Sequence, residues 1–275
     1  MDFLPLAALL LVLLGSAAVG EPLPAPQRLT FNCSWDGSRW PYLLQPPPQE
    51  PQAVLIYLHG HYADEEQGMA PGSYNDAFGK LRRECLTRHW AYVTAWYGGN
   101  SWMGPVGEAG LVDLIGILRE RWPGRPIYLG GGSMGGSSAL IFAHRHPDLL
   151  AGVIALCPAG DIATYYHFAV GSGNPTLQNI AAAIRLHYTV AGRDLEAELT
   201  ARSALVQAER LTMPLYLCHG DADAVIPIAP TRSLVARLLE LKRPVRYREL
   251  PGGDHNAPVN EVNWTEALDF VSRRP

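Results

Sequence analysis

The chain alternates between short apolar runs and longer segments in which apolar residues recur every three or four positions. Short apolar runs bounded by turn residues are typical of buried parallel strands, and the longer spacing is typical of helices packed against a sheet. The predicted strands are 54–58, 91–96, 125–130, 151–157, 215–220 and 245–250. The predicted helices between and after them are 75–89, 108–121, 134–146, 231–241 and 262–272.

Strands that alternate with helices predict the α/β class, with a mostly parallel twisted sheet and helices on both faces. Two further strands are expected in 28–45, where Asp36-Gly37 favours the turn of an antiparallel hairpin. We therefore expect about eight strands. A chain of 275 residues is compatible with one α/β domain, which we place at 21–275.

One connection is too long for a simple crossover between neighbouring strands. About 50 residues, 161–212, separate two predicted strands, and they contain helix-prone stretches at 180–188 and 195–210. We expect this insertion to form a small helical cap over the site described below.

The N-terminal segment reads as a targeting sequence. Residues 3–14 are almost wholly apolar and lead into small residues up to Gly20, the pattern of a cleavable secretory signal. We expect cleavage near Gly20 and a secreted or periplasmic protein without a stable membrane span. Asp2 stands where a basic residue is usual, so an uncleaved anchor is the alternative. The mass of the mature protein would distinguish them.

The composition limits the classes of binding partner but does not distinguish between folds. Charged residues make up 17% of the chain and the formal net charge is −4, which offers no attraction to nucleic acid or anionic membranes. Hydrophobic residues at 48% suffice for a large core. Four cysteines allow three disulfide pairings, of which Cys33–Cys85 is the first to consider, whereas Cys157 and Cys218 end strand-like runs and fit buried thiols.

The first candidate for chemistry is the run Gly131-Gly132-Ser133-Met134-Gly135. It lies between a predicted strand and a predicted helix, the setting of a Gly-x-Ser-x-Gly elbow that exposes a nucleophilic serine above the sheet. The same glycines also match a dinucleotide fingerprint, which requires an acidic residue about 20 positions later, at the end of the next strand. Residues 151–157 contain none, so we favour Ser133 as a nucleophile.

A serine nucleophile needs a base and an acid that orients the base. The strand 215–220 runs into a tight turn with two carboxylates, Asp221 and Asp223, and either could be the acid. His255 lies on a glycine-rich loop directly after the last predicted strand, where the loop must reach back to the elbow. Of the nine histidines it has the best position for the base.

An acyl-transfer enzyme also needs two preorganised N–H donors for the oxyanion. The backbone N–H of Met134 follows the nucleophile, and the loop after strand 54–58 carries His59-Gly60-His61-Tyr62, where His61 is the expected second donor. Two histidines so close could instead suggest a metal. No further well-placed ligand set completes such a site, so we expect no metal.

These motifs together resemble serine hydrolases of the α/β-hydrolase superfamily, in particular secreted esterases near the dienelactone hydrolases and the catalytic domains of prolyl-oligopeptidase-type peptidases. The residues that carry the resemblance are His59-Gly60-His61, Gly131 to Gly135, the run His219-Gly220-x-x-Asp223-x-x-Ile226-Pro227, and Gly252-Gly253-Asp254-His255. The resemblance implies Ser133 as nucleophile, Asp223 rather than Asp221 as acid, His255 as base, and no cofactor. Dienelactone hydrolases carry cysteine as nucleophile, so serine favours general ester hydrolysis.

The function expected from the sequence is hydrolysis of a small-molecule or saccharide carboxylic ester through an acyl-enzyme. Tyr62, Trp102 and Tyr165 are candidate substrate contacts, since aromatic faces near the site could stack on a sugar or an aromatic acyl group. Alternatives are a peptidase of the same fold, a catalytically silent binding module and a nucleotide-binding protein. Nothing in the sequence indicates the oligomeric state.

Overall fold

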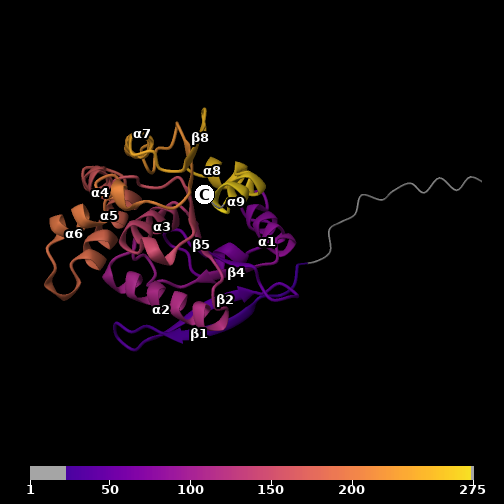
Figure 1. The fold of residues 1–275 in the computed structure, drawn as a ribbon. Helices are drawn as coiled ribbons and strands as arrows, with labels where there is room; N and C mark the ends of the chain where they lie inside the picture. Colours follow the sequence, from indigo (N-terminus) through magenta and orange to yellow (C-terminus); the bar gives the residue numbers. More distant parts are fainter. Residues whose placement is uncertain (1–22, 274–275) are drawn as a thin grey trace, which may run out of the picture.

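A computed structural model describes residues 23–273, and the predicted signal segment lies outside the described residues. Its centre is one eight-stranded sheet in the order β1-β2-β4-β3-β5-β6-β7-β8 (Figure 1). From β4 onward in this order the neighbours are parallel, whereas β1 pairs with β2 and β2 with β4 in the antiparallel sense. The strands are β1 Gln27–Asn32, β2 Arg39–Gln45, β3 Ala53–Leu58, β4 Trp90–Ala95, β5 Ile127–Gly132, β6 Gly152–Leu156, β7 Leu215–Gly220 and β8 Val245–Leu250. The predicted α/β class, mostly parallel sheet and opening hairpin are confirmed.

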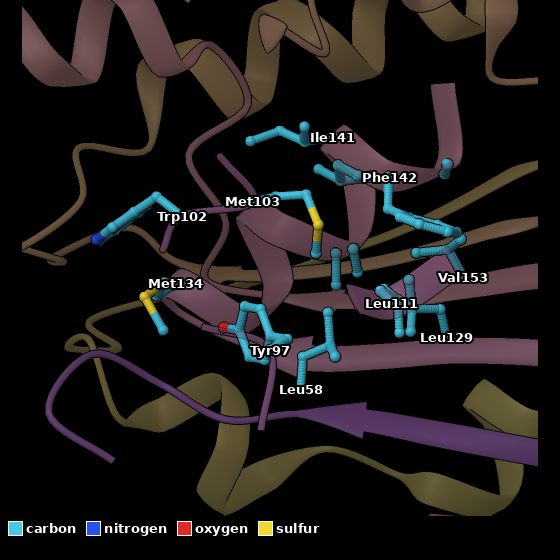
Figure 2. Close-up of a cluster of buried hydrophobic side chains, with 14 of the residues drawn as sticks. Leu58, Tyr97, Trp102, Met103, Leu111, Leu129, Met134, Ile141, Phe142 and Val153 are labelled. Atoms are coloured by element: carbon cyan, nitrogen blue, oxygen red, sulfur yellow. The ribbon is translucent and has the colours of Figure 1, made fainter. Parts of the chain in front are cut away.

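Helices cover both faces of this sheet, because alternate residues of each central strand point to opposite sides. In β3, Val54, Ile56 and Leu58 enter one apolar cluster, and Leu55 and Tyr57 the other. The first cluster includes side chains of α2 Pro105–Arg121 and α3 Met134–Arg145 (Figure 2), and also of α7 Ala229–Glu240. The second includes side chains of α1 Ala77–Thr87, α8 Ala257–Glu261 and α9 Trp264–Val271, which lie together on the other side of the sheet in Figure 1.

The insertion after β6 forms three helices, α4 Ile162–Val170, α5 Pro175–Tyr188 and α6 Leu195–Arg202, which lie together at one side of the molecule (Figure 1). Each begins at an Asp or Asn whose side chain accepts a backbone N–H of the first turn, which satisfies an otherwise unpaired helical donor. The sequence did not predict α4. The helix expected over 195–210 ends at Arg202, and 203–210 is turns and a short 3-10 helix.

A buried charge cluster fastens the insertion to the sheet's helices. Arg202 of α6, whose side chain is 1% exposed, pairs with Glu108 of α2 at 2.8 Å and with Glu198 at 2.9 Å. Glu108 also accepts from Arg145 at 2.6 Å and from His146 at 2.8 Å. Burial alone would raise the pKa of Glu108, but the hydrogen bond from His146 and the charges of Arg202 and Arg145 lower it to about 2.

Glu108→Gln should lower the free energy of unfolding at pH 7 by about 3 kcal/mol, because a buried arginine loses a charged partner. The Glu108 pKa is lowered on folding from 4.5, so its contribution is complete above that pH and is lost as the pH falls toward about 2. Urea unfolding of both proteins at pH 7 and pH 2.5 measures this. A stability difference that stays the same at both pH values would contradict this account of Glu108.

The four cysteines are free, buried thiols, so the Cys33–Cys85 bridge considered first is not formed. Cys33 lies in the apolar cluster on one face of the sheet and Cys85 in the cluster on the other, which explains why the two cannot meet. Among residues 23–273, no helix is both long and apolar enough to cross a bilayer.

Candidate active site

Ser133 lies at a sharp turn between β5 and α3. Its backbone is strained, with φ +58° and ψ −121°, a conformation that only surrounding structure can maintain. Close packing demands the glycines around it: a Cβ on Gly135 would lie 2.1 Å from the carbonyl oxygen of Leu58, and one on Gly131 would lie 2.4 Å from the carbonyl carbon of Gly135. The N–H of Ser133 donates to the carbonyl of Leu156 at 2.9 Å, which fixes the turn against β6.

Three side chains from distant loops meet at this turn. Nε2 of His255 lies 2.9 Å from Oγ of Ser133, and Nδ1 of His255 lies 2.7 Å from Oδ2 of Asp223. Both are hydrogen-bond distances. The carboxyl ends of the parallel strands β5, β7 and β8 bring the three residues to one edge of the sheet, the usual location of sites in open α/β folds.

The carboxylate of Asp223 is wholly buried and fully hydrogen-bonded. Its Oδ1 accepts the N–H groups of Val225 at 2.8 Å and Ile226 at 2.9 Å, and its Oδ2 faces both His255 and His219, the latter at 3.2 Å. Burial would raise the pKa of Asp223, but the hydrogen bonds from His219 and His255, and the charge of His255, hold it well below its ordinary value. Asp223 is therefore a stable anion beside the imidazole of His255.

Asp221, the other candidate acid, does not contact His255. Its Oδ1 accepts the N–H of Gly252 at 2.6 Å, and the N–H of Asp221 donates to the carbonyl of Leu250. Asp221 ties the loop after β7 to the loop that carries His255, and so supports the base from a distance.

His219 is a buried neighbour of the acid that sequence reasoning did not single out for a role. Its Nε2 lies between Oδ2 of Asp223 and the carbonyl of Ile226, at 3.0 Å from the latter, and its Nδ1 lies 3.1 Å from Oγ1 of Thr231. Its position four residues before Asp223, in the motif quoted for the resemblance, was the available signal.

The two N–H groups predicted for the oxyanion hole have no acceptor in the described part of the chain. Their neighbours do: Gly60 N–H donates to Oε1 of Gln67 at 2.7 Å, and Tyr62 N–H donates to Oδ1 of Asn100 at 2.8 Å. Met134 begins α3, where the first N–H groups lack helical partners and the helix dipole favours negative charge. His61 lies in the turn after β3 and lines the same pocket as Ser133.

The three aromatic residues predicted as substrate contacts differ in their exposure and in whether they line the pocket. Tyr62 is 63% exposed and lines the pocket beside Ser133. Trp102 and Tyr165 are 0% and 2% exposed and are absent from that lining, so the prediction that they offer open stacking faces was wrong. Tyr165 lies on α4 of the insertion, and its ring packs against that of Trp102 at 5.3 Å between centroids.

The pocket next to Ser133 has a volume of about 250 Å³. Its wall combines β3, α1, the elbow, α5 and the loop of His255, and among these lining residues there is no Asp, Glu, Lys or Arg. The apolar part of the lining is Tyr57, Tyr74, Phe78, Ile180, Val225 and Val259. The polar part is Gln67, Thr176 and Asn256, together with His61, Tyr62, Ser133 and His255. Such a pocket suits an uncharged group.

Metal ligation has no support in residues 23–273, where no group of three or more His, Cys, Asp or Glu side chains could hold an ion. His59, two residues before His61, is 1% exposed, and its ring packs against Tyr97 at 4.5 Å between centroids. Burial lowers the pKa of His59 to about 4, so it is a neutral core residue near pH 7.

Comparisons with known proteins agree with the fold. A family model described as serine aminopeptidase, S33, matches residues 109–199, which include Ser133 but neither Asp223 nor His255. A monoacylglycerol lipase of Mycolicibacterium smegmatis is 26% identical over 192 residues, which are 58% of this chain and 65% of the lipase.

Two similar solved structures are a thermostable esterase and a puromycin-hydrolyzing peptidase of Mycobacterium tuberculosis. The esterase is 20% identical with a TM-score of 0.63, over 90% of this chain and 63% of the esterase chain. The peptidase is 18% identical with a TM-score of 0.67, over 91% of this chain and 40% of the peptidase chain. This chain thus spans less than two thirds of the length of each of these relatives. The fold is that of the α/β-hydrolases.

Proposed function

We propose that this protein is a serine esterase that hydrolyses uncharged carboxylic esters. The observation that carries the proposal is the continuous hydrogen-bonded path from Oγ of Ser133 through His255 to the buried carboxylate of Asp223. A serine hydroxyl is a weak nucleophile until an adjacent base takes its proton, and this path supplies that base.

In the proposed mechanism, Oγ of Ser133 attacks the ester carbonyl while Nε2 of His255 takes the hydroxyl proton. Asp223 accepts the Nδ1–H of His255, which keeps Nε2 free to accept and stabilises the imidazolium. The tetrahedral oxyanion is bound by the N–H groups of Met134 and His61. His255 then protonates the leaving alcohol, and water, activated by the same base, hydrolyses the acyl-enzyme.

The uncharged lining of the pocket supports neutral esters over substrates with a free terminus. An aminopeptidase must bind an ammonium group, which calls for a carboxylate, and the lining provides none. The family model is described as a serine aminopeptidase, but the lining of this pocket supports an esterase more strongly than an aminopeptidase. At about 250 Å³ the pocket is slightly smaller than most small-molecule sites, which supports a short acyl group.

A matched substrate set tests this selectivity. We expect kcat/KM for p-nitrophenyl butyrate to exceed that for mono-p-nitrophenyl succinate by about 100-fold or more, because burying an unpaired carboxylate costs several kcal/mol. Alanine p-nitroanilide, which carries a free amino group, should be cleaved more slowly still. Faster cleavage of the anilide than of the butyrate would favour the aminopeptidase instead.

We also propose that the protein is exported. The support is the apolar run at 3–14 followed by small residues up to Gly20. Expression of the full chain in a secreting host, followed by the mass of the recovered protein, tests this. A mature chain that starts near Glu21 supports export, whereas a chain that keeps residues 1–20 in the membrane fraction supports the uncleaved anchor.

A further inference from the structure

The imidazole of His61 is hydrogen-bonded at both ring nitrogens, by side chains from two other segments. The indole N–H of Trp102 donates to Nδ1 at 3.2 Å, and Nε2 lies 3.1 Å from Oδ1 of Asn179. An indole N–H can only donate, so Nδ1 must be the unprotonated nitrogen and Nε2 carries the hydrogen. Burial lowers the pKa of His61, which favours this neutral form. His61 is thus held in one tautomer and donates to Asn179.

Asn179 belongs to α5, the middle helix of the insertion, and lies on its pocket side. Thr176 and Ile180, three residues before it and one after, line the cavity beside Ser133. Residues three and four positions apart share one helix face. The helix that forms one wall of the pocket is therefore also the helix that binds the ring of His61.

The backbone of Trp102, whose indole contacts the ring of His61, is itself fixed by hydrogen bonds from the insertion. Trp102 and Met103 both have positive φ, +47° and +56°, which is unfavourable for large side chains. The insertion fixes both: the hydroxyl of Tyr188 donates to the carbonyl of Trp102 at 2.8 Å, and Nη1 of Arg202 donates to the carbonyl of Met103 at 2.5 Å. In Figure 2 the indole nitrogen of Trp102 lies at the edge of the buried cluster, away from its other side chains.

We infer that Asn179 is a positioning residue for the oxyanion hole, acting through the side chain of His61 on the backbone N–H of the same residue. This inference rests on the proposed esterase function. The N–H of His61 has no acceptor in the described part of the chain, while the carbonyl of the same peptide, that of Gly60, accepts the N–H of Ala63 at 3.2 Å and lies 2.9 Å from Nδ1 of His59. The two ring contacts of His61 anchor the residue at its side chain as well, and so limit rotation of the N–H about the turn. Oxyanion donors must lie within about half an ångström of their productive position.

Asn179→Leu tests the inference, because leucine matches the size of asparagine and cannot accept a hydrogen bond. We expect kcat for p-nitrophenyl butyrate to fall about 5- to 20-fold, between the effect of one lost hydrogen bond and that of one lost oxyanion donor. KM should change less than about twofold, because the donor acts mainly in the transition state. An unchanged kcat would overturn the inference.

Two further variants separate positioning from a general effect on α5. Gln178→Leu removes a neighbouring exposed amide, which donates to the carbonyl of Ser172, and should leave kcat within about twofold of the parent. Asn179→Asp keeps an acceptor oxygen in the same place and should restore most of the turnover at pH 9, where His61 is neutral. Equal losses in all three variants would show that α5 is merely sensitive to substitution.

A double-mutant cycle with His61→Ala, which removes the ring and keeps the backbone N–H, completes the test. Asn179→Leu should cost nothing further in the His61→Ala protein, because the ring that links the two is gone. Additive losses would contradict the inference. These outcomes are distinct from failure of the proposed function, in which the parent protein itself would hydrolyse no ester.

Discussion

Ser133→Ala is expected to lower kcat for p-nitrophenyl butyrate on the order of 10⁵-fold, while the protein stays folded. Among residues 23–273, Oγ of Ser133 is the only side-chain partner of Nε2 of His255, so no neighbouring side chain on that path can replace it as nucleophile. Oγ makes no other protein hydrogen bond among the described residues, because the bond that Ser137 donates is to the backbone carbonyl of Ser133. Its removal should therefore change Tm by less than about 4 °C.

A matched serine provides the control. Ser233 lies on the exposed side of α7, where its hydroxyl donates to the carbonyl of Ala229. Ser233→Ala should retain full activity, measured with the same ester and the same preparation. A Ser133→Ala protein that kept a tenth or more of the parent's turnover would mean that the nucleophile lies elsewhere.

Asp223→Asn should lower kcat about 10⁴-fold. Oδ1 of Asp223 accepts two backbone N–H groups, so the asparagine oxygen takes that place and its NH₂ group faces His255. Nδ1 of His255 must then accept, which puts the proton on Nε2, opposite Oγ of Ser133. A protonated Nε2 cannot take the proton of the serine hydroxyl. Initial rates at saturating ester measure the loss.

Asp221→Asn is the matched variant, since the sequence alone leaves both carboxylates as candidates for the acid. The asparagine oxygen can still accept the N–H of Gly252, and the position has no contact with the imidazole. We expect activity within about threefold of the parent. If Asp221→Asn were the inactive variant and Asp223→Asn the active one, the assignment of the acid would be reversed.

Much of the fold follows from local sequence. The apolar run at 54–58 is a strand as predicted, because parallel strands buried between helix layers have few polar positions. The segment 245–250, which carries three charged residues, is also a strand as predicted and lies at the edge of the sheet. The elbow follows from its glycines, since any larger residue at Gly135 would collide with the backbone of β3. These features depend on neighbours in the sequence or on steric rules that hold in any context.

The rest depends on contacts between distant segments. Trp102 reads as an accessible aromatic residue on a glycine-rich loop, yet it is buried because Tyr188, 86 residues later, holds its carbonyl. Asn179 has no motif around it, and its partner His61 lies 118 residues away. The helix α4 is missed because its run of aromatic residues has no clear helical period, and tertiary packing decides its form.

The central claim is that His255 and Asp223 activate the hydroxyl of Ser133. The most direct test is the intact mass of the protein after treatment with a fluorophosphonate, which reacts with activated serines, followed by peptide mapping. The account predicts one adduct per chain, located on Ser133, and none on the His255→Ala protein in the same time. No adduct on the folded parent protein, or an adduct on another residue, would contradict it.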